Sequence, residues 1–189
     1  MSDSRFDWTI SITLSLALMA AANAMAPSTE GMRKLYTYLR RDARWMPPGW
    51  LFGLAWSVLY PLIAVSIVLW SDRDVLHRTG AMWYWTWILF IVNLVANLAW
   101  SSIFFGAFRP NAKPDTFLNA QKKPWIVSRA LLNLAVVDAV VIAATAGALE
   151  TLFAVDTDER KTSVIVMWAF YLAWTLYAFL LTLEIALRE

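Results

Sequence analysis

Long uncharged stretches are the feature of this sequence that most restricts its fold. The longest, Ala81–Phe108, contains no Lys, Arg, Asp or Glu, and Trp8–Ala26 and Ser163–Leu183 are uncharged as well. About 20 consecutive apolar residues allow a helix to cross the hydrocarbon core of a bilayer. The chain is 60% hydrophobic and only 16% charged, so the sequence indicates an all-α integral membrane protein. A transmembrane β-barrel would instead show short segments of alternating polarity.

The apolar stretches divide the chain into five spans. We predict a single domain, residues 1–189, folded as a bundle of five transmembrane helices. The predicted spans cover about 8–26, 50–70, 81–105, 126–153 and 163–185. A cleavable signal peptide is the alternative for the first span, because that span ends in small residues, Ala22–Ala26. Acidic residues flank the one arginine that precedes it, and this favours a retained span.

Two of the connections between spans are long and basic. Pro27–Arg44 carries apolar residues at helical spacing, so we expect either a short interfacial helix or a solvated basic loop. Arg109–Pro124 contains three prolines and is predicted to be an irregular loop on the membrane surface. These connections and the C-terminus carry ten Lys and Arg residues, against five on the other side. The positive-inside rule therefore places the long first loop and the C-terminus on the cytosolic side.

Several kinds of site are excluded or disfavoured by composition. The chain has no cysteine, so it has no disulfide, thiolate nucleophile or Cys-based metal site. Its one histidine, His77, stands in a charged turn and is expected to be a surface residue rather than a metal ligand. No basic, aromatic-interleaved patch of the nucleic-acid-binding type is present. We expect no metal, no cofactor, no conventional catalytic group and no nucleic-acid partner.

Polar residues inside the spans are candidates for function. Asn93, Asn97 and Trp100 fall on one face of the third span. Buried amides are costly in a membrane without partners, so they either bond to neighbouring helices or line a polar-tipped cavity. Asp138, near the middle of the fourth span, is either a functional acid or a buried structural carboxyl bonded across the bundle.

The second span begins with the most distinctive motif of the chain. Trp45-Met-Pro-Pro-Gly-Trp-Leu-Phe52 leads into a helix expected to begin at about Pro48, since proline fits the first turn. Phe52, Trp56 and Tyr60 then recur every fourth residue and share one face. This pattern suits an aromatic ligand site, or else a membrane-anchoring tryptophan followed by a packing stripe.

These residues resemble a known family. The run from Trp45 to Tyr60 is similar to the W-x-P-P-x-W-x-F-x-x-x-W-x-x-L-Y signature of the TspO/MBR family, the translocator protein or peripheral-type benzodiazepine receptor group. Asn97–Gly106 resembles the N-x-x-W-S-x-x-F-F-G motif of the family's third helix. Asp138 stands where the fourth helix carries an acid, and Tyr171–Trp174 resembles Y-L-x-W of the fifth helix.

The resemblance implies a five-helix bundle with a ligand cavity beneath the long first loop. Family ligands are tetrapyrroles such as porphyrins, sterols, and benzodiazepine-type drugs. The ligand-binding candidates are Trp45, Phe52, Trp56, Tyr60, Asn93, Asn97, Trp100, Asp138, Tyr171 and Trp174. Arg40, Arg41 and Arg44 of the first loop are candidates to meet porphyrin propionates, although setting the topology is an equally good role for them.

The expected function is that of a membrane receptor or sensor for hydrophobic ligands, most of all tetrapyrroles. A transporter of porphyrin or cholesterol is the alternative, and a light-dependent porphyrin-degrading enzyme is the second. The resemblance also implies the lipid bilayer as surroundings and a homodimer as one form. It implies the mitochondrial outer membrane in a eukaryote or a bacterial membrane in a prokaryote.

The sequence departs from the family pattern in places. Phe170 and Thr182 replace the usual proline and asparagine of the fifth helix, so we expect animal-type drug ligands to bind poorly. Tyr177 is not followed by a basic residue at the spacing of the animal cholesterol pattern. The connection 106–125 belongs to a segment longer than the family norm.

Overall fold

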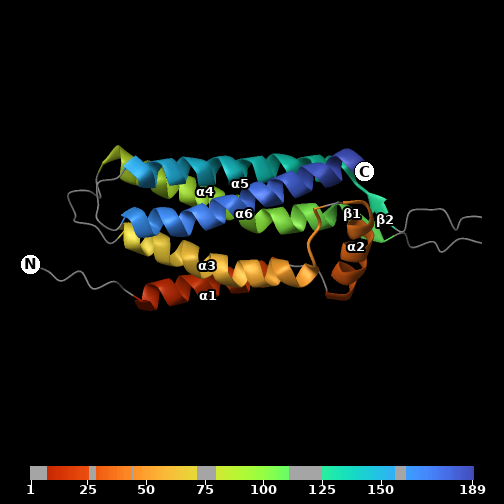
Figure 1. Cartoon of the computed structure of the whole chain (residues 1–189), viewed down its shortest axis with the longest axis horizontal. Helices are drawn as coiled ribbons and strands as arrows, with labels where there is room; N and C mark the ends of the chain where they lie inside the picture. Colours follow the sequence, from red (N-terminus) through yellow and green to blue (C-terminus); the bar gives the residue numbers. More distant parts are fainter. Residues whose placement is uncertain (1–7, 26–28, 44, 72–79, 111–124, 156–160) are drawn as a thin grey trace, which may run out of the picture.

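The computed structural model describes residues 8–25, 29–43, 45–71, 80–110, 125–155 and 161–189. Its helices are α1 (Trp8–Met25), α2 (Thr29–Asp42), α3 (Gly49–Ser71), α4 (Ala81–Gly106), α5 (Arg129–Val155) and α6 (Lys161–Arg188). Two short strands, β1 (Phe108–Pro110) and β2 (Trp125–Val127), lie between α4 and α5. Figure 1 shows α1, α3, α4, α5 and α6 side by side along the long axis, with α2 and the strands at one end. We call this the α2 end.

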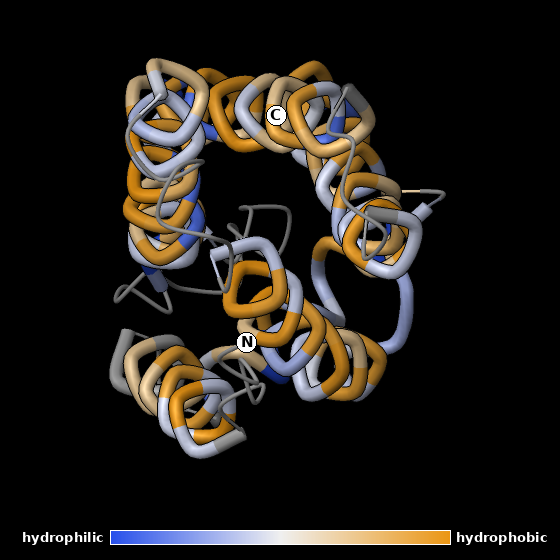
Figure 2. Tube along the Cα trace, turned by 90° about the vertical axis from the view of Figure 1, so that its left-hand side faces the viewer, coloured by the Kyte–Doolittle hydropathy of each residue, from blue (hydrophilic) through white to orange (hydrophobic). Residues whose placement is uncertain are grey.

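The five long helices form a closed ring. Helix α1 packs on α3 and on α4, α3 packs on α6, and α5 packs on both α4 and α6. Figure 2 shows the bundle of helices end-on. The order around the ring is therefore α1, α3, α6, α5, α4, and side chains pointing inward from several helices meet inside it.

Helix length and composition make this a multi-pass membrane protein. Within the described residues, α3, α4, α5 and α6 are each long and apolar enough to cross a bilayer, and Thr9–Ala21 of α1 is a shorter apolar helix. Large apolar side chains point outward, such as Val95 at 62%, Phe170 at 63% and Leu180 at 60% exposed. Polar side chains such as Asn93 and Thr182 are buried instead. This distribution suits a protein whose outer solvent is lipid.

The ends of α4 and α5 differ from the sequence prediction. The span predicted to begin at residue 126 starts as a helix only at Arg129, and the residues before it form β2. The connection predicted to be irregular starts as β1, which pairs antiparallel with β2 through Phe108↔Val127 and Pro110↔Trp125. The rest of that connection, 111–124, lies outside the described residues. Trp125-Ile-Val127 has the aromatic and β-branched side chains that favour a strand, and Ser128 supplies the helix cap, with its Oγ accepting from the Leu131 N–H at 3.4 Å.

The first connection forms a helix, α2, at the end of the bundle (Figure 1). Leu35 and Leu39 on one face are each 3% exposed, whereas Arg40 and Arg41 are exposed. Leu35 and Leu39 belong to one buried cluster with Phe104 of α4, Leu132 of α5 and Leu181 of α6. An amphipathic helix that lies on an apolar surface has this division of faces. Helix α2 is therefore packed onto the bundle as well as bordering the solvent.

Candidate functional site

A cavity of about 270 Å³ lies beneath α2, between α1, α3 and α4. Its walls are mostly aromatic or apolar, with a few small and polar residues. They are Met19, Met32, Tyr36, Gly49, Phe52, Gly53, Trp56, Ser57, Tyr60, Asn97, Leu98, Trp100, Ser101 and Phe105. None of these described wall residues carries a charge. We call this space the main cavity.

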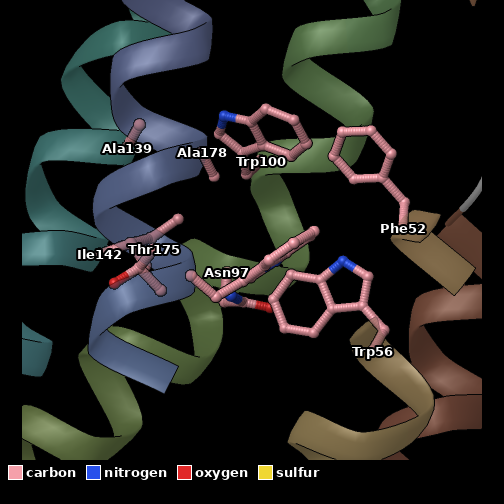
Figure 3. A pocket seen from close by; sticks show the side chains of 9 residues that line it. Phe52, Trp56, Asn97, Trp100, Ala139, Ile142, Thr175 and Ala178 are labelled. Atoms are coloured by element: carbon pink, nitrogen blue, oxygen red, sulfur yellow. The ribbon is translucent and has the colours of Figure 1, made fainter. Parts of the chain in front are cut away.

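A smaller compartment of about 30 Å³ adjoins it on the side of α5 and α6. Four residues line both spaces: Phe52, Trp56, Asn97 and Trp100. The side of α5 and α6 is formed by Ala139, Ile142, Thr175 and Ala178 (Figure 3), and Trp174 of α6 also lines the space. We call this space the side compartment. Its lining therefore combines four large rings with the small side chains of two alanines and a threonine.

Helix α3 supplies the aromatic side of both spaces. The Leu51 N–H donates to the Pro48 carbonyl at 2.9 Å, so helical hydrogen bonding starts at Pro48, as predicted. Trp56 stacks on Tyr60 with ring centroids 4.9 Å apart and 24° between planes, and its edge meets Trp174 at 6.4 Å. Spacing by four residues places these rings in a column along the helix. Flat, parallel faces of this kind are suited to stacking against a flat ligand.

Helix α3 contains a proline, Pro61. It lies inside α3 and has no N–H, so the carbonyl four residues earlier, that of Ser57, receives no helical hydrogen bond from it. Ser57 lines the main cavity. The helix ladder thus lacks one hydrogen bond beside the main cavity.

A hydrogen-bond network across three helices holds Asn97 in place. The Tyr171 hydroxyl donates to Asn93 Oδ1 at 2.6 Å, and Asn97 Nδ2 donates to the Tyr171 oxygen at 3.2 Å. Asn93 Nδ2 donates in turn to the Ile142 carbonyl and to Thr145 Oγ1 of α5. Asn93 and Tyr171 are 3% and 1% exposed, so they are buried behind the cavity wall. Both alternatives for the two amides hold, since Asn93 ties helices together and Asn97 does this while lining the cavity.

Trp100 presents an unused donor in the wall between the two spaces. Its ring stacks on that of Phe104, with the ring centroids 4.8 Å apart and 11° between the planes. Its buried Nε1 has no hydrogen-bond partner among the described residues. In Figure 3 this nitrogen is on the side of Ala139. A buried donor without a partner is unfavourable. A ligand carbonyl or ring nitrogen that accepted from it would remove that cost.

The roof of the main cavity is held by hydroxyl groups and rings. The ring of Tyr36 of α2 packs against those of Phe52 and Phe105, with ring centroids 5.6 Å and 6.2 Å apart. Burial raises the pKa of Tyr36 to about 12, so its hydroxyl stays protonated at physiological pH. The Tyr177 hydroxyl of α6 donates to the Trp45 carbonyl at 2.6 Å, which fixes the segment between α2 and α3.

The predicted site residues separate into three groups. Phe52, Trp56, Tyr60, Asn97, Trp100 and Trp174 line the main cavity, the side compartment or both. Asn93 and Tyr171 lie behind that wall in the hydrogen-bond network. Outside the walls of both spaces lie Trp45, 69% exposed, Asp138 and the exposed Arg40 and Arg41. Arg44 and His77 lie outside the described residues.

Sequence reasoning missed several wall residues. Tyr36 lies on the apolar face of a short helix, and nothing in the local sequence shows that this face covers a cavity. Thr175 and Ala178 follow Tyr171 and Trp174 by one helical turn, so the same spacing argument reaches them. Met19 lies in the first span, where no motif marks it.

The chain is similar to known proteins over most of this region. The profile of the TspO/MBR family matches residues 11–113, which include the walls supplied by α1, α2, α3 and α4. Protein CrtK of Rhodobacter capsulatus is 35% identical over 74 residues, 39% of this chain and 44% of that protein. Tryptophan-rich protein TspO of Chlorobaculum tepidum is 30% identical over 106 residues, 53% of this chain and 60% of that protein.

A longer match is found in Tryptophan-rich protein TspO of Bacillus cereus. It is 28% identical over 153 residues, 77% of this chain and 80% of that protein. The chain thus spans less than two thirds of the first two relatives and about four fifths of the third. The family profile covers more than half of the sequence and includes the proline–tryptophan motif and every residue that lines the main cavity, so the chain belongs to the TspO/MBR family.

Proposed function

We propose that this protein is a membrane receptor that binds flat hydrophobic molecules, tetrapyrroles first among them, in the main cavity beneath α2. The observation that carries the proposal is the wall shared by the two spaces, where the rings of Phe52, Trp56 and Trp100 stand beside one fixed amide, Asn97. Small-molecule sites are mostly apolar and aromatic, with a few polar groups that orient the ligand. The uncharged wall suits a ligand whose ring system is apolar.

The volume of the cavity limits what fits without movement. At about 270 Å³ the main cavity is just below the range of roughly 300–1,000 Å³ typical of small-molecule sites. A complete tetrapyrrole therefore requires the shared wall to move, so that the main cavity and the side compartment become one space. The residues that line both spaces include the large rings of Trp56 and Trp100, and rotation of these rings is the movement that we propose.

The proposal extends to how the chain sits in its membrane. We take α1 as the fifth span and α2 with the following segment as the lid of the cavity. The lid residues Arg40 and Arg41, which are exposed, are then positioned at the aqueous boundary, where they can attract the propionates of a porphyrin. A cytosolic lid, a homodimeric form and a mitochondrial outer or bacterial membrane are parts of the same proposal.

Tryptophan fluorescence can test the proposal directly. The purified protein in detergent is titrated with protoporphyrin IX in the dark, beside Trp56→Phe, Trp174→Phe and Trp83→Phe. Trp83 packs against Trp87 at the end of α4 far from the cavity, so its variant is the matched control. We expect saturable quenching that weakens about tenfold in the two cavity variants, equal to about 1.4 kcal/mol, and is unchanged in the control. Linear quenching that is equal in all proteins would contradict the proposal.

Two further arms identify the alternatives. Protoporphyrin IX dimethyl ester lacks the propionate charges. Docking of the propionates on the lid would be supported if the parental protein bound the ester more weakly than the free acid, and if Arg40→Ala/Arg41→Ala bound the two ligands equally. Illumination of the complex followed by chromatography of the pigment detects a porphyrin-degrading enzyme. Ligand flux through sealed liposomes detects a transporter.

A further inference from the structure

One cavity residue also borders a groove on the outer face of the bundle. The groove lies between α3 and α6 and has a volume of about 620 Å³. It is lined by Ala55, Val58 and Leu62 of α3 and by Phe170, Ala173 and Trp174 of α6, among others. Trp174 also lines the side compartment. A single indole therefore has the inner compartment on one side and the outer groove on the other.

The groove faces the hydrocarbon region of the membrane. Val58 and Phe170 at its rim are 51% and 63% exposed, and both lie within helices long and apolar enough to span a bilayer. Two of the residues that line the groove between the packed helices α3 and α6, Ala55 and Ala173, have small side chains that leave space there. Its occupant in the membrane is whatever apolar molecule the bilayer contains.

The α2 end of the cavity is closed more firmly. Leu35, Leu39, Ala43 and Met46 are between 3% and 6% exposed and belong to the buried cluster that includes residues of α4, α5 and α6. The hydrogen bonds from Tyr177 to the Trp45 carbonyl and from Tyr38 to Glu189 Oε1 fasten this region to the bundle. Opening the roof exposes these apolar side chains and breaks these bonds, whereas a route from the side requires only side chains to move, first Trp174 and then the wall shared by the two spaces.

The surroundings of Trp174 allow that motion. The centroid of its ring lies 5.6 Å from that of Phe52 and 6.4 Å from that of Trp56, and the ring planes meet at 74° and 84°. No hydrogen bond of its indole N–H restrains it among the contacts that the structure describes. The outer groove has free volume next to the ring, while the side compartment offers only about 30 Å³. An outward swing of the indole therefore joins the groove to the side compartment, which adjoins the main cavity.

We propose that the groove between α3 and α6 is the lateral entrance to the cavity, with Trp174 as its gate, and that it admits uncharged flat hydrophobic molecules dissolved in the bilayer. This inference rests on the proposed function, because it concerns the route by which the same ligand arrives. Such molecules partition into the hydrocarbon core, so a side entrance meets them where they are concentrated. Charged ligands, which stay at the aqueous boundary, are excluded from this route.

The test separates the route from the affinity. The protein in lipid nanodiscs is mixed with protoporphyrin IX dimethyl ester in a stopped-flow instrument, and tryptophan quenching gives the association and dissociation rates. Ala173→Phe fills the groove from the exposed side of α6, and Ala173→Leu is a milder variant if the first does not fold. Ala169→Phe is the matched control, since Ala169 is also exposed on α6, one turn earlier, and does not line the groove.

A cross-link tests the competing route at the roof. The chain has no cysteine, so Tyr38→Cys/Glu189→Cys introduces the only thiol pair, which a bifunctional thiol reagent then joins. We expect Ala173→Phe to slow association and dissociation together by about fivefold or more, with the dissociation constant unchanged within twofold. The control and the cross-linked protein should keep the parental rates.

The outcomes distinguish the two proposals. Saturable binding whose rates are unchanged by Ala173→Phe and Ala173→Leu, or are slowed by the cross-link, would overturn the lateral entrance and leave the receptor proposal standing. Absence of saturable binding in every protein would overturn the receptor proposal, and the entrance with it.

Discussion

The two ends of the bundle use tryptophan in opposite ways. At the end far from α2, Trp70, Phe153 and Trp168 are at most 2% exposed and pack ring against ring, with centroids 5.5–6.1 Å apart between Phe153 and its two neighbours. The Trp168 indole N–H donates to the Ala146 carbonyl at 2.9 Å. At the α2 end, Trp56, Trp100 and Trp174 are only partly buried and surround the main cavity and the side compartment.

The difference shows that a count of tryptophans does not locate a binding site. Rings at the far end fill the space between helices, and the Trp168 N–H finds its hydrogen-bond acceptor within the bundle. Rings near α2 stand beside small residues, such as Ala139 and Ala178, and leave space between them. Stability should therefore depend most on the far end, and ligand affinity on the α2 end.

The largest expected effect is on stability at the far end. Trp168→Ala leaves a cavity in a packed region and removes a hydrogen bond, so we expect it to destabilise the protein by about 3–5 kcal/mol. Trp56→Ala, which enlarges an existing space, should cost less than about 1.5 kcal/mol. Unfolding in detergent followed by circular dichroism measures both. Equal losses of stability would refute the division between the two ends.

Ligand affinity should show the reverse order. Trp56→Ala removes a stacking face, and we expect the affinity for protoporphyrin IX to fall at least tenfold, which is about 1.4 kcal/mol or more. Trp168→Phe keeps the packing of the far end and should change affinity less than twofold. Isothermal or fluorescence titration gives both constants. A similar loss in Trp168→Phe would mean that the far end also contacts ligand.

Tyr171 lies between the two ends and should affect both properties modestly. Tyr171→Phe removes the donor to Asn93 and the acceptor of Asn97. Hydrogen bonds between membrane helices contribute about 0.6 kcal/mol on average and up to about 1.7, so we expect a loss of about 1 kcal/mol. Affinity should fall about threefold because the Asn97 amide loses its orientation. Tyr84→Phe, on an exposed tyrosine, is the control. An effect of the same size in this variant would mean that the loss in Tyr171→Phe does not come from the hydrogen bonds to Asn93 and Asn97.

The smallest expected effect is that of pH on binding. The described cavity walls carry no charge, and burial raises the pKa of Tyr36 from its usual 10 to about 12. The Tyr36 hydroxyl stays protonated in the folded protein until pH approaches 12, and stability that depends on the neutral form is lost only above pH 10. Affinity for protoporphyrin IX dimethyl ester should change less than twofold between pH 6 and pH 9. A change of fivefold or more would indicate that a carboxyl group such as that of Asp138 reaches the ligand.

Much of the helical frame follows from the sequence because lipid imposes long apolar helices. A long uncharged run such as Ala81–Phe108 restricts where the helix can begin and end, and α4 begins at the predicted residue, Ala81. Local chemistry near Trp125 was harder to interpret, since an apolar strand and the start of an apolar helix look alike over three residues. The pairing partner of that strand, β1, lies far enough back in the chain that no local pattern reveals it.

The candidate site was predictable where it depends on one helix and not where it depends on several. Phe52, Trp56 and Tyr60 line the spaces because one helical period places them together. Whether Asn93 faces the cavity or lies behind Asn97 depends on where Tyr171 and Thr145 stand on other helices. Asp138 illustrates the same limit, since its place outside both walls is set by the rotation of α5 against its neighbours.

The short ribbon of β1 and β2 has a practical consequence for engineering. Pairing of Phe108 with Val127 joins the end of α4 to the start of α5 within a few residues of both helices, and the Ser128 N–H bonds to the Ala107 carbonyl at 2.8 Å. Sequence added or removed beyond Pro110 and before Trp125 thus meets a closed junction before it reaches either helix. A fluorescent reporter or an affinity handle inserted there should leave the geometry of the cavity unchanged.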